Sequence, residues 1–192
     1  MRISTILASV SSVIILAGCA APPPMNFTPH DVVYSTQRIN AELKSINVSF
    51  PSDDKGKMRV LNALNNYQSG STSLDFRTNF KVSLEEALNL SGIFTDDAKT
   101  KINIYAQLVD LDVPSMGLSF PTTSTVIYKI QRRSDGKVLY EKEIKAVGES
   151  AINDLMGVNR SLSALNVSYQ NNIKAFIADL EAEAQSQSNP FK

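Results

Sequence analysis

The residue types that carry most protein chemistry are scarce in this 192-residue chain, which has one cysteine, Cys19, and one histidine, His30. A disulfide needs two thiols, and the usual zinc site needs several cysteine or histidine ligands, so the chain has too few parts for either. A Ser-His-Asp triad would depend on His30, which stands beside Pro29 and which we interpret as a solvated residue. No glycine-rich phosphate loop is present. We therefore predict no metal, no cofactor and no catalytic residues.

Paired carboxylates are the remaining candidates for catalysis or Ca²⁺ binding. Acidic pairs occur at 53–54 and at 96–97, and Asp110 and Asp112 lie two residues apart on one face of a predicted strand. The first two pairs are typical of turns and helix starts, because aspartate hydrogen-bonds its own neighbouring backbone. The structural interpretation is favoured for all three pairs, and we predict that the protein is not an enzyme.

Cys19 has a more specific setting. It follows Leu16-Ala17-Gly18, which ends an apolar stretch that starts at Ile6 behind a single basic residue, Arg2. A charged start, a short apolar core and small residues at the cut are typical of a secretion signal. The stretch is too short for a membrane-spanning helix, which needs about 20 apolar residues. Residues 1–18 are thus predicted to be a signal peptide.

The cysteine directly after the small residues resembles a lipobox, the cleavage and acylation site of bacterial lipoproteins. This resemblance implies that Cys19 becomes the acylated N-terminus. Ala20 follows it, where an aspartate would imply retention in the inner membrane in enteric lipoproteins. The resemblance therefore implies an anchor in the outer membrane and a domain on its periplasmic face.

The charge of the chain gives no sign of nucleic-acid binding. It contains 19 basic and 19 acidic residues, and removal of the signal takes away only Arg2, so the mature chain has 18 − 19 = −1. A nucleic-acid binder shows a basic patch, which is lacking here. The expected partners are instead the outer membrane, through the lipid on Cys19, and one or more envelope proteins.

Composition divides the mature chain into three parts. Residues 19–37 are predicted to be the lipidated cysteine and a tether, with a stiff Pro22-Pro23-Pro24 run and with Met25 to Pro29 continuing it. Residues 38–184 form the predicted periplasmic domain, and the polar residues 185–192 a flexible tail.

Apolar periodicity predicts the first elements of this domain. Residues 39–50 alternate as a strand, with a change of phase between Leu43 and Ile46 that indicates a bulge. Residues 73–90 repeat at helical spacing and end at Gly92, which is expected in the left-handed conformation of a Schellman ending. Residues 58–66 fit a helix or an edge strand, and we slightly favour the strand.

Three more strands are predicted at 101–113, 118–132 and 137–147, with a bulge near Leu108. A three-residue loop, 134–136, would place Ile130 opposite Tyr140, whereas a two-residue loop would mix core and charged residues on one face. We favour the three-residue loop, with Gly136 in a left-handed conformation.

A second long helix is predicted over 159–184. Its apolar residues step by three or four positions and form one stripe: Leu162, Leu165, Tyr169, Ile173, Phe176 and Leu180. The fold class is therefore α+β: two layers, with a mainly antiparallel sheet of about four to five strands and two long helices on one face. The same apolar stripe could also form a coiled coil, which is the less favoured interpretation.

Four segments carry a resemblance to a known group of proteins. They are residues 84–88 and 91–94, where a helix ends before a strand, residues 104–108, and residues 172–176 in the closing helix. With the lipobox, this pattern over residues 38–183 resembles the auxiliary lipoproteins of lipid-trafficking ABC systems, and more distantly the N-terminal domains of the TolB and CsgG types. The resemblance implies a shape and carries over no active site.

Two regions are candidates for binding. Met116 and Leu118 lie in an apolar turn, which suits an adaptable contact surface. The sheet face away from the helices is polar and free to receive another subunit; it carries Thr123, Thr125, Lys129, Gln131, Glu141 and Glu143. We predict a non-catalytic accessory protein that docks through this face or an exposed edge strand. The alternative is a carrier of lipid or another apolar ligand.

Overall fold

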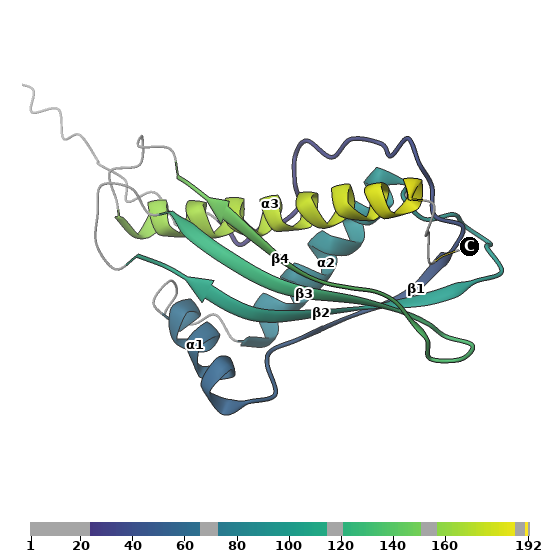
Figure 1. Ribbon diagram of the computed structural model, residues 1–192. Helices are drawn as coiled ribbons and strands as arrows, with labels where there is room; N and C mark the ends of the chain where they lie inside the picture. Colours follow the sequence, from purple (N-terminus) through teal and green to yellow (C-terminus); the bar gives the residue numbers. More distant parts are fainter. Residues whose placement is uncertain (1–23, 66–72, 115–120, 151–156, 187–190, 192) are drawn as a thin grey trace, which may run out of the picture.

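A computed structural model describes residues 24–65, 73–114, 121–150, 157–186 and 191. The elements run, in order, β1 (Glu42–Ser49), α1 (Asp54–Asn65), α2 (Ser73–Ser91), β2 (Lys101–Asp112), β3 (Thr122–Arg132), β4 (Val138–Gly148) and α3 (Gly157–Gln185). They form an α+β fold with one open sheet, as predicted (Figure 1).

The sheet has four strands in the order β1-β2-β3-β4. β1 pairs with β2 in parallel and the other two pairings are antiparallel, so the sheet is mixed, with one parallel strand at its edge. Both predicted bulges are present, as register shifts between Leu43 and Ser45 and between Leu108 and Asp110.

The long helices α2 and α3 supply the second layer. α3 packs on β3 and β4, whereas α2 packs on β1 and contacts α3. All six residues of the predicted α3 stripe are fully buried. The inward residues of the strands complete the same core, among them Ile104, Leu108, Val126, Tyr128 and Ile130.

The preference for a strand over residues 58–66 was wrong, because residues 58–65 belong to α1; residue 66 lies outside the described residues. Asp53 starts the helix: its carboxylate accepts a hydrogen bond of 2.6 Å from the N–H of Gly56, and its carbonyl accepts one from the N–H of Lys57. A side chain that caps the first turn outweighs a weak alternation of apolar residues. α1 packs against β2, which continues beyond the end of β1.

Helix α2 ends at Ser91, and Gly92 follows it with a φ of 58°, in the left-handed conformation that was predicted. The N–H of Gly92 donates to the carbonyl of Leu88, but the N–H of Ile93 donates to Oγ of Ser91 rather than to that carbonyl. The ending is therefore the simpler left-handed motif and not a full Schellman motif. Leu88 and Ile93 both lie in the core.

The β3–β4 hairpin has the predicted pairing of Ile130 with Tyr140, and Gly136 has a φ of 72°. At its tip the register shifts by one, and the N–H of Arg132 donates to the carbonyl of Lys137. The loop is therefore residues 133–136, one residue longer than predicted, because the shift leaves an extra residue on β4.

The packed domain begins earlier in the chain than residue 38. Residues 24–38, which we call the strap, lie along the helices, and Phe27 is fully buried between them (Figure 1). Phe27 contacts three aromatic rings at centroid distances of 5.1 to 6.2 Å, those of Phe76, Phe80 and Tyr169. The segment from Met25 to Pro29 is thus packed on the helices through Phe27 and is not a free tether. At the other end, Phe191 is also buried in the core.

Replacement of Phe27 by alanine tests this boundary. Loss of a fully buried ring should lower the free energy of unfolding by about 3–5 kcal/mol. The exposed His30, three residues along the strap, provides the control His30→Ala, which should leave stability unchanged. Urea denaturation followed by circular dichroism measures both, and equal stabilities for the two variants would contradict the packing of the strap.

Candidate functional site

The structure describes some of the residues that were predicted to carry function and leaves others outside the described ranges. Cys19, Met116 and Leu118 lie outside the described residues, so their roles stay predictions. His30 is exposed on the strap. No group of three or more His, Cys, Asp or Glu side chains that could hold a metal ion occurs among the described residues.

The carboxylates of Asp110 and Asp112 are arranged as the sequence indicates. Asp110 pairs with Thr125 and Asp112 pairs with Thr123, so the two carboxylates lie on the same face of β2. Asp110 is half-buried and Asp112 is exposed. Nothing in the part of the chain that the structure describes brings a third acidic group or a histidine to them. Among the described residues, the pair therefore has no third ligand with which to hold a metal ion.

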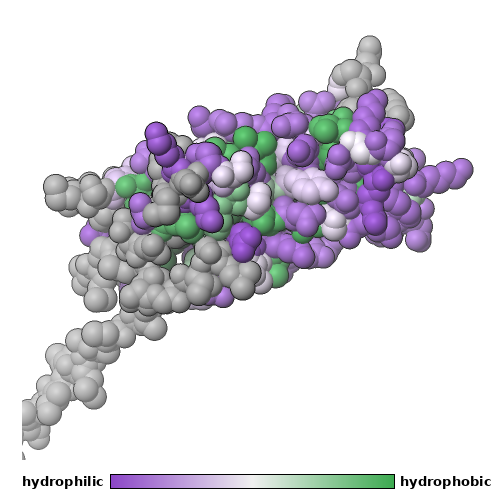
Figure 2. All heavy atoms as spheres, turned by 90° about the horizontal axis from the view of Figure 1, so that it is seen from below, coloured by the Kyte–Doolittle hydropathy of each residue, from purple (hydrophilic) through white to green (hydrophobic). Residues whose placement is uncertain are grey.

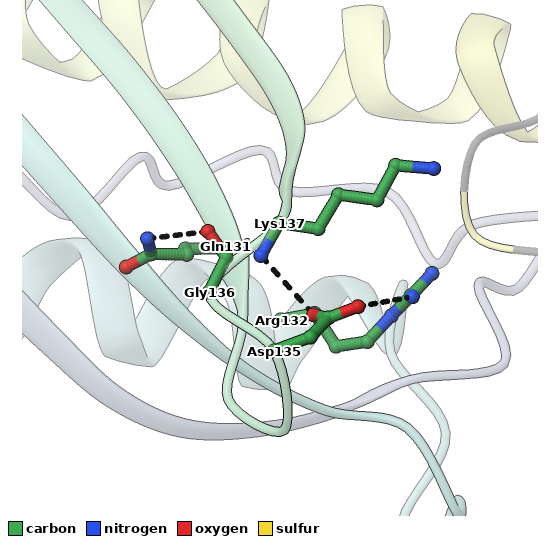
Figure 3. Close-up of polar contacts among 5 residues, drawn as sticks. All are labelled: Gln131, Arg132, Asp135, Gly136 and Lys137. Atoms are coloured by element: carbon green, nitrogen blue, oxygen red, sulfur yellow. Dashed lines mark hydrogen bonds and ion pairs between the residues drawn. The ribbon is translucent and has the colours of Figure 1, made fainter.

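The tip of the β3–β4 hairpin is held by its own polar contacts (Figure 3). The carboxylate of Asp135 accepts hydrogen bonds from the N–H of Lys137, at 3.1 Å, and from Nη1 of Arg132, at 3.0 Å. These donors lower the pKa of Asp135 below its ordinary value, with the backbone N–H as the larger cause. The side chain of Gln131 donates to the carbonyl of Gly136. The tip is thus held by contacts among its own residues, and these contacts point to no ligand.

The sheet face away from the helices is polar, as predicted. The six residues named for this face alternate with core residues along β3 and β4, and Lys129 lies 5.8 Å from the centroid of the Tyr105 ring. In the view from below, hydrophobic areas are small and separated by hydrophilic side chains (Figure 2). An open polar face of this kind is ordinary for a two-layer domain.

The two edges of the sheet differ more sharply than its faces. At the β4 edge, side chains of α3 bond to the strand backbone: Oγ of Ser168 donates to the carbonyl of Ala146, and Nδ2 of Asn172 to that of Ile144. Gly148 lies so close to α3 that a Cβ there would be 2.1 Å from the backbone nitrogen of Ser168. The second half of β4 is thereby closed to a further strand.

A buried polar network supports this closed edge. Asn172 is fully buried, and its Oδ1 accepts a hydrogen bond of 2.9 Å from the hydroxyl of Tyr128. Burial raises the pKa of Tyr128 well above its ordinary value, so the phenol stays a neutral donor. The Tyr128 ring stacks on that of Phe176 at a centroid distance of 3.9 Å. The buried polar groups that join α3 to the sheet are thus hydrogen-bonded, and the aromatic rings beside them are stacked.

The β1 edge, by contrast, is open. β1 pairs with β2 on one side and has no neighbour on its other side among the described strands. A cleft of about 360 Å³ lies there, between β1 and the last turns of α2, which we call the β1–α2 cleft. Leu43 and Phe94, both half-buried, and the buried Leu88 contribute apolar surface to it.

Polar groups make up the rest of the cleft. Arg38 donates to the carbonyls of Gly92 and Phe94 and so fixes the loop after α2. Glu42 forms ion pairs with Lys101 and Lys44, which lower its pKa in that order of size. On the α2 side the exposed Glu85 and Asn89 line the cleft, as does Asp96 in the following loop.

This arrangement is suited to binding an extended chain. An edge strand offers free backbone N–H and C=O groups to a further strand. A neighbouring helix can then contact every second side chain of that added strand. An exposed edge strand is one of the docking routes expected from the sequence, but no pattern in the sequence identifies the residues of the cleft. No sequence signal marks Glu85 or Asn89, because the cleft arises only when the parallel pairing puts β1 at the edge.

No helix in the described part of the chain is long and apolar enough to cross a membrane.

Comparisons with known proteins show similarity of fold. The sequence matches no family model and no curated protein. Protein XCC0632 of Xanthomonas campestris, from family DUF330, is similar with a TM-score of 0.55 and 12% identity, over 88% of this chain and 98% of that one. This likeness concerns the fold alone.

Two further solved structures are more distant. The hypothetical protein CT253 of Chlamydia trachomatis has a TM-score of 0.49 and 9% identity, over 74% of this chain and 97% of that one. A minor lipoprotein of Acinetobacter baumannii has a TM-score of 0.39 and 11% identity, over 72% of this chain and 91% of that one.

The closed β4 edge makes a prediction for stability. Asn172→Ala should lower the free energy of unfolding by about 2–4 kcal/mol, since it leaves the buried Tyr128 hydroxyl and a strand carbonyl without partners. Asn171→Ala removes one bond to the carbonyl of Val147 at the partly exposed surface and should lower it by about 1 kcal/mol or less. Similar losses in urea denaturation would contradict the role given to the network.

Proposed function

We propose that this protein is a lipid-anchored accessory protein of the bacterial envelope that docks an extended segment of a partner protein in the β1–α2 cleft. It has no catalytic role. The acylated Cys19 holds it at the periplasmic face of the outer membrane, and the partner is another envelope protein. Backbone hydrogen bonds to β1 supply affinity, and the cleft selects side chains.

The anchor is supported by the sequence. The basic start, the short apolar core and the Leu-Ala-Gly-Cys run end at the only cysteine of the chain. A lone thiol with no disulfide partner fits a site of acylation, and Ala20 fits export to the outer membrane.

The difference between the two sheet edges carries the docking proposal. Natural proteins close sheet edges that would otherwise recruit another strand. Here the side chains of Ser168 and Asn172 bond to the β4 backbone, whereas β1 is left open beside a cleft with apolar surface. The second half of the β4 edge is closed, whereas the β1 edge is open beside a cleft, and such an open edge is best explained as a place for a partner.

The resemblance to auxiliary lipoproteins of lipid-trafficking ABC systems suggests the kind of envelope system to which the partner belongs. It would make the protein an accessory of an envelope transport system. A carrier that holds lipid between helices and sheet is the alternative. That space is occupied by fully buried rings, among them Phe76, Phe80, Tyr128, Tyr169 and Phe176, which favours docking over carriage.

The cleft proposal predicts a loss of binding when the cleft is filled. Asn89→Trp puts a large ring into the cleft from an exposed position, and Lys81→Trp adds the same ring to α2 outside it. Affinity purification of the acylated protein from solubilised envelopes should recover a specific protein partner with the unaltered protein and Lys81→Trp, but not with Asn89→Trp. Recovery with all three, at equal thermal stability, would contradict docking in the cleft.

Acylation has its own test. Cys19→Ala should move the protein from the membrane fraction to the soluble periplasmic fraction and reduce recovery of the partner. Mass spectrometry of the purified protein should detect acyl chains on residue 19 of the unaltered protein. Stoichiometric bound lipid without a protein partner would favour the carrier.

A further inference from the structure

The strap is fastened along the whole length of its contact with α3. The side chain of Asn166 bonds to the backbone of Pro24 and Asn26, at 3.0 and 3.2 Å. Fifteen residues further along α3, the carboxylate of Glu181 accepts hydrogen bonds from both N and Oγ1 of Thr36, each 2.8 Å. The strap thus runs along about 22 Å of the helix, at 1.5 Å per residue.

Between these ends the strap is also fixed to α2 and by an ion pair. The N–H of Phe27 donates to Oγ of Ser83, and the hydroxyl of Thr28 donates to Glu86. Asp31 forms an ion pair of 3.0 Å with Lys174. Together with the buried ring of Phe27, these contacts make Pro24 a fixed point on the surface of the domain.

The chain between this fixed point and the lipid is short. Cys19 and Pro24 are five residues apart, and five residues span at most about 18 Å. Helix α3, with 29 residues, is itself about 43 Å long. The link between Cys19 and Pro24 is less than half as long as α3. It therefore keeps the region around Pro24 and Asn166 near the bilayer.

The β1–α2 cleft lies away from this region. Pro24 is bonded to Asn166, whereas Arg38, which lines the cleft, follows two residues after Thr36, which is bonded to Glu181. Asn166 and Glu181 are fifteen residues apart on α3, which corresponds to about 22 Å. The strap runs along the helices toward the end of the molecule where β1 begins (Figure 1).

We infer that the strap is a rigid mount that holds the Asn166 side of α3 against a lipid surface and turns the β1–α2 cleft toward the periplasm. This inference rests on the proposed acylation of Cys19. The surface at the bilayer carries the amide side chains of Asn26, Asn166 and Gln170, which bond to the strap backbone and suit hydrated lipid headgroups. Because the cleft is held in this orientation, the domain does not have to rotate about its tether before a partner can bind.

Fluorescence quenching in vesicles tests the mount. The acylated full-length protein is placed in phosphatidylethanolamine–phosphatidylglycerol vesicles that contain a headgroup-quencher lipid. A dye is attached to a cysteine introduced as Ser163→Cys, on the α3 face of Asn166, or as Asn89→Cys, in the cleft. The dye at 163 should be quenched about twofold more strongly than the dye at 89, because the link spans no more than about 18 Å.

A longer link is the matched control. A flexible insertion of twelve Gly and Ser residues between Ala21 and Pro22 leaves the strap and the fold untouched, and it should abolish the difference between the two dyes. Equal quenching with the natural link, or stronger quenching at residue 89, would overturn the mount while leaving the anchor intact. Failure of the acyl-processed protein to float with the vesicles would overturn the anchor and the mount together.

Discussion

Four aromatic rings join three distant stretches of this chain. Phe27 of the strap lies against Phe76 and Phe80 of α2 and Tyr169 of α3, and Tyr169 meets both rings of α2 edge-on, at 5.2 and 5.5 Å. Tilted and edge-to-face rings at such distances attract one another beyond the area they bury. The separation of the two long helices, the course of the strap and the place where the anchor meets the domain all depend on this cluster.

The rest of the domain closes part of the open sheet and leaves β1 accessible. Side chains of α3 bond to the backbone of β4, and α1 packs on the part of β2 that extends beyond β1. At β1 the sheet meets the β1–α2 cleft. Pro24, where the anchor meets the domain, lies at one end of the strap, and Arg38, which lines the cleft, lies at the other. This arrangement links the way the protein is anchored to the way it would meet a partner.

The sequence predicted the elements whose own residues define them. The α3 stripe, the left-handed Gly92, both bulges and the pairing of Ile130 with Tyr140 all follow from periodicity or turn chemistry that acts over a few residues. The parallel pairing of β1, and with it the cleft, depends on contacts between residues about 60 positions apart, which local patterns do not encode. Phe27 illustrates a signal that was available: a free tether has no reason to carry a large aromatic residue, and its presence indicated packing.

The most direct test of docking at the open edge is site-specific photo-crosslinking in intact cells. A benzophenone amino acid at position 89 would lie in the cleft, and the same group at position 81 would lie on α2 outside it. The account predicts one adduct with an envelope protein from position 89 and none from position 81, with the linked peptide in an extended segment of the partner. Adducts of the same kind from both positions, or none from position 89 while the protein remains membrane-bound, would contradict it.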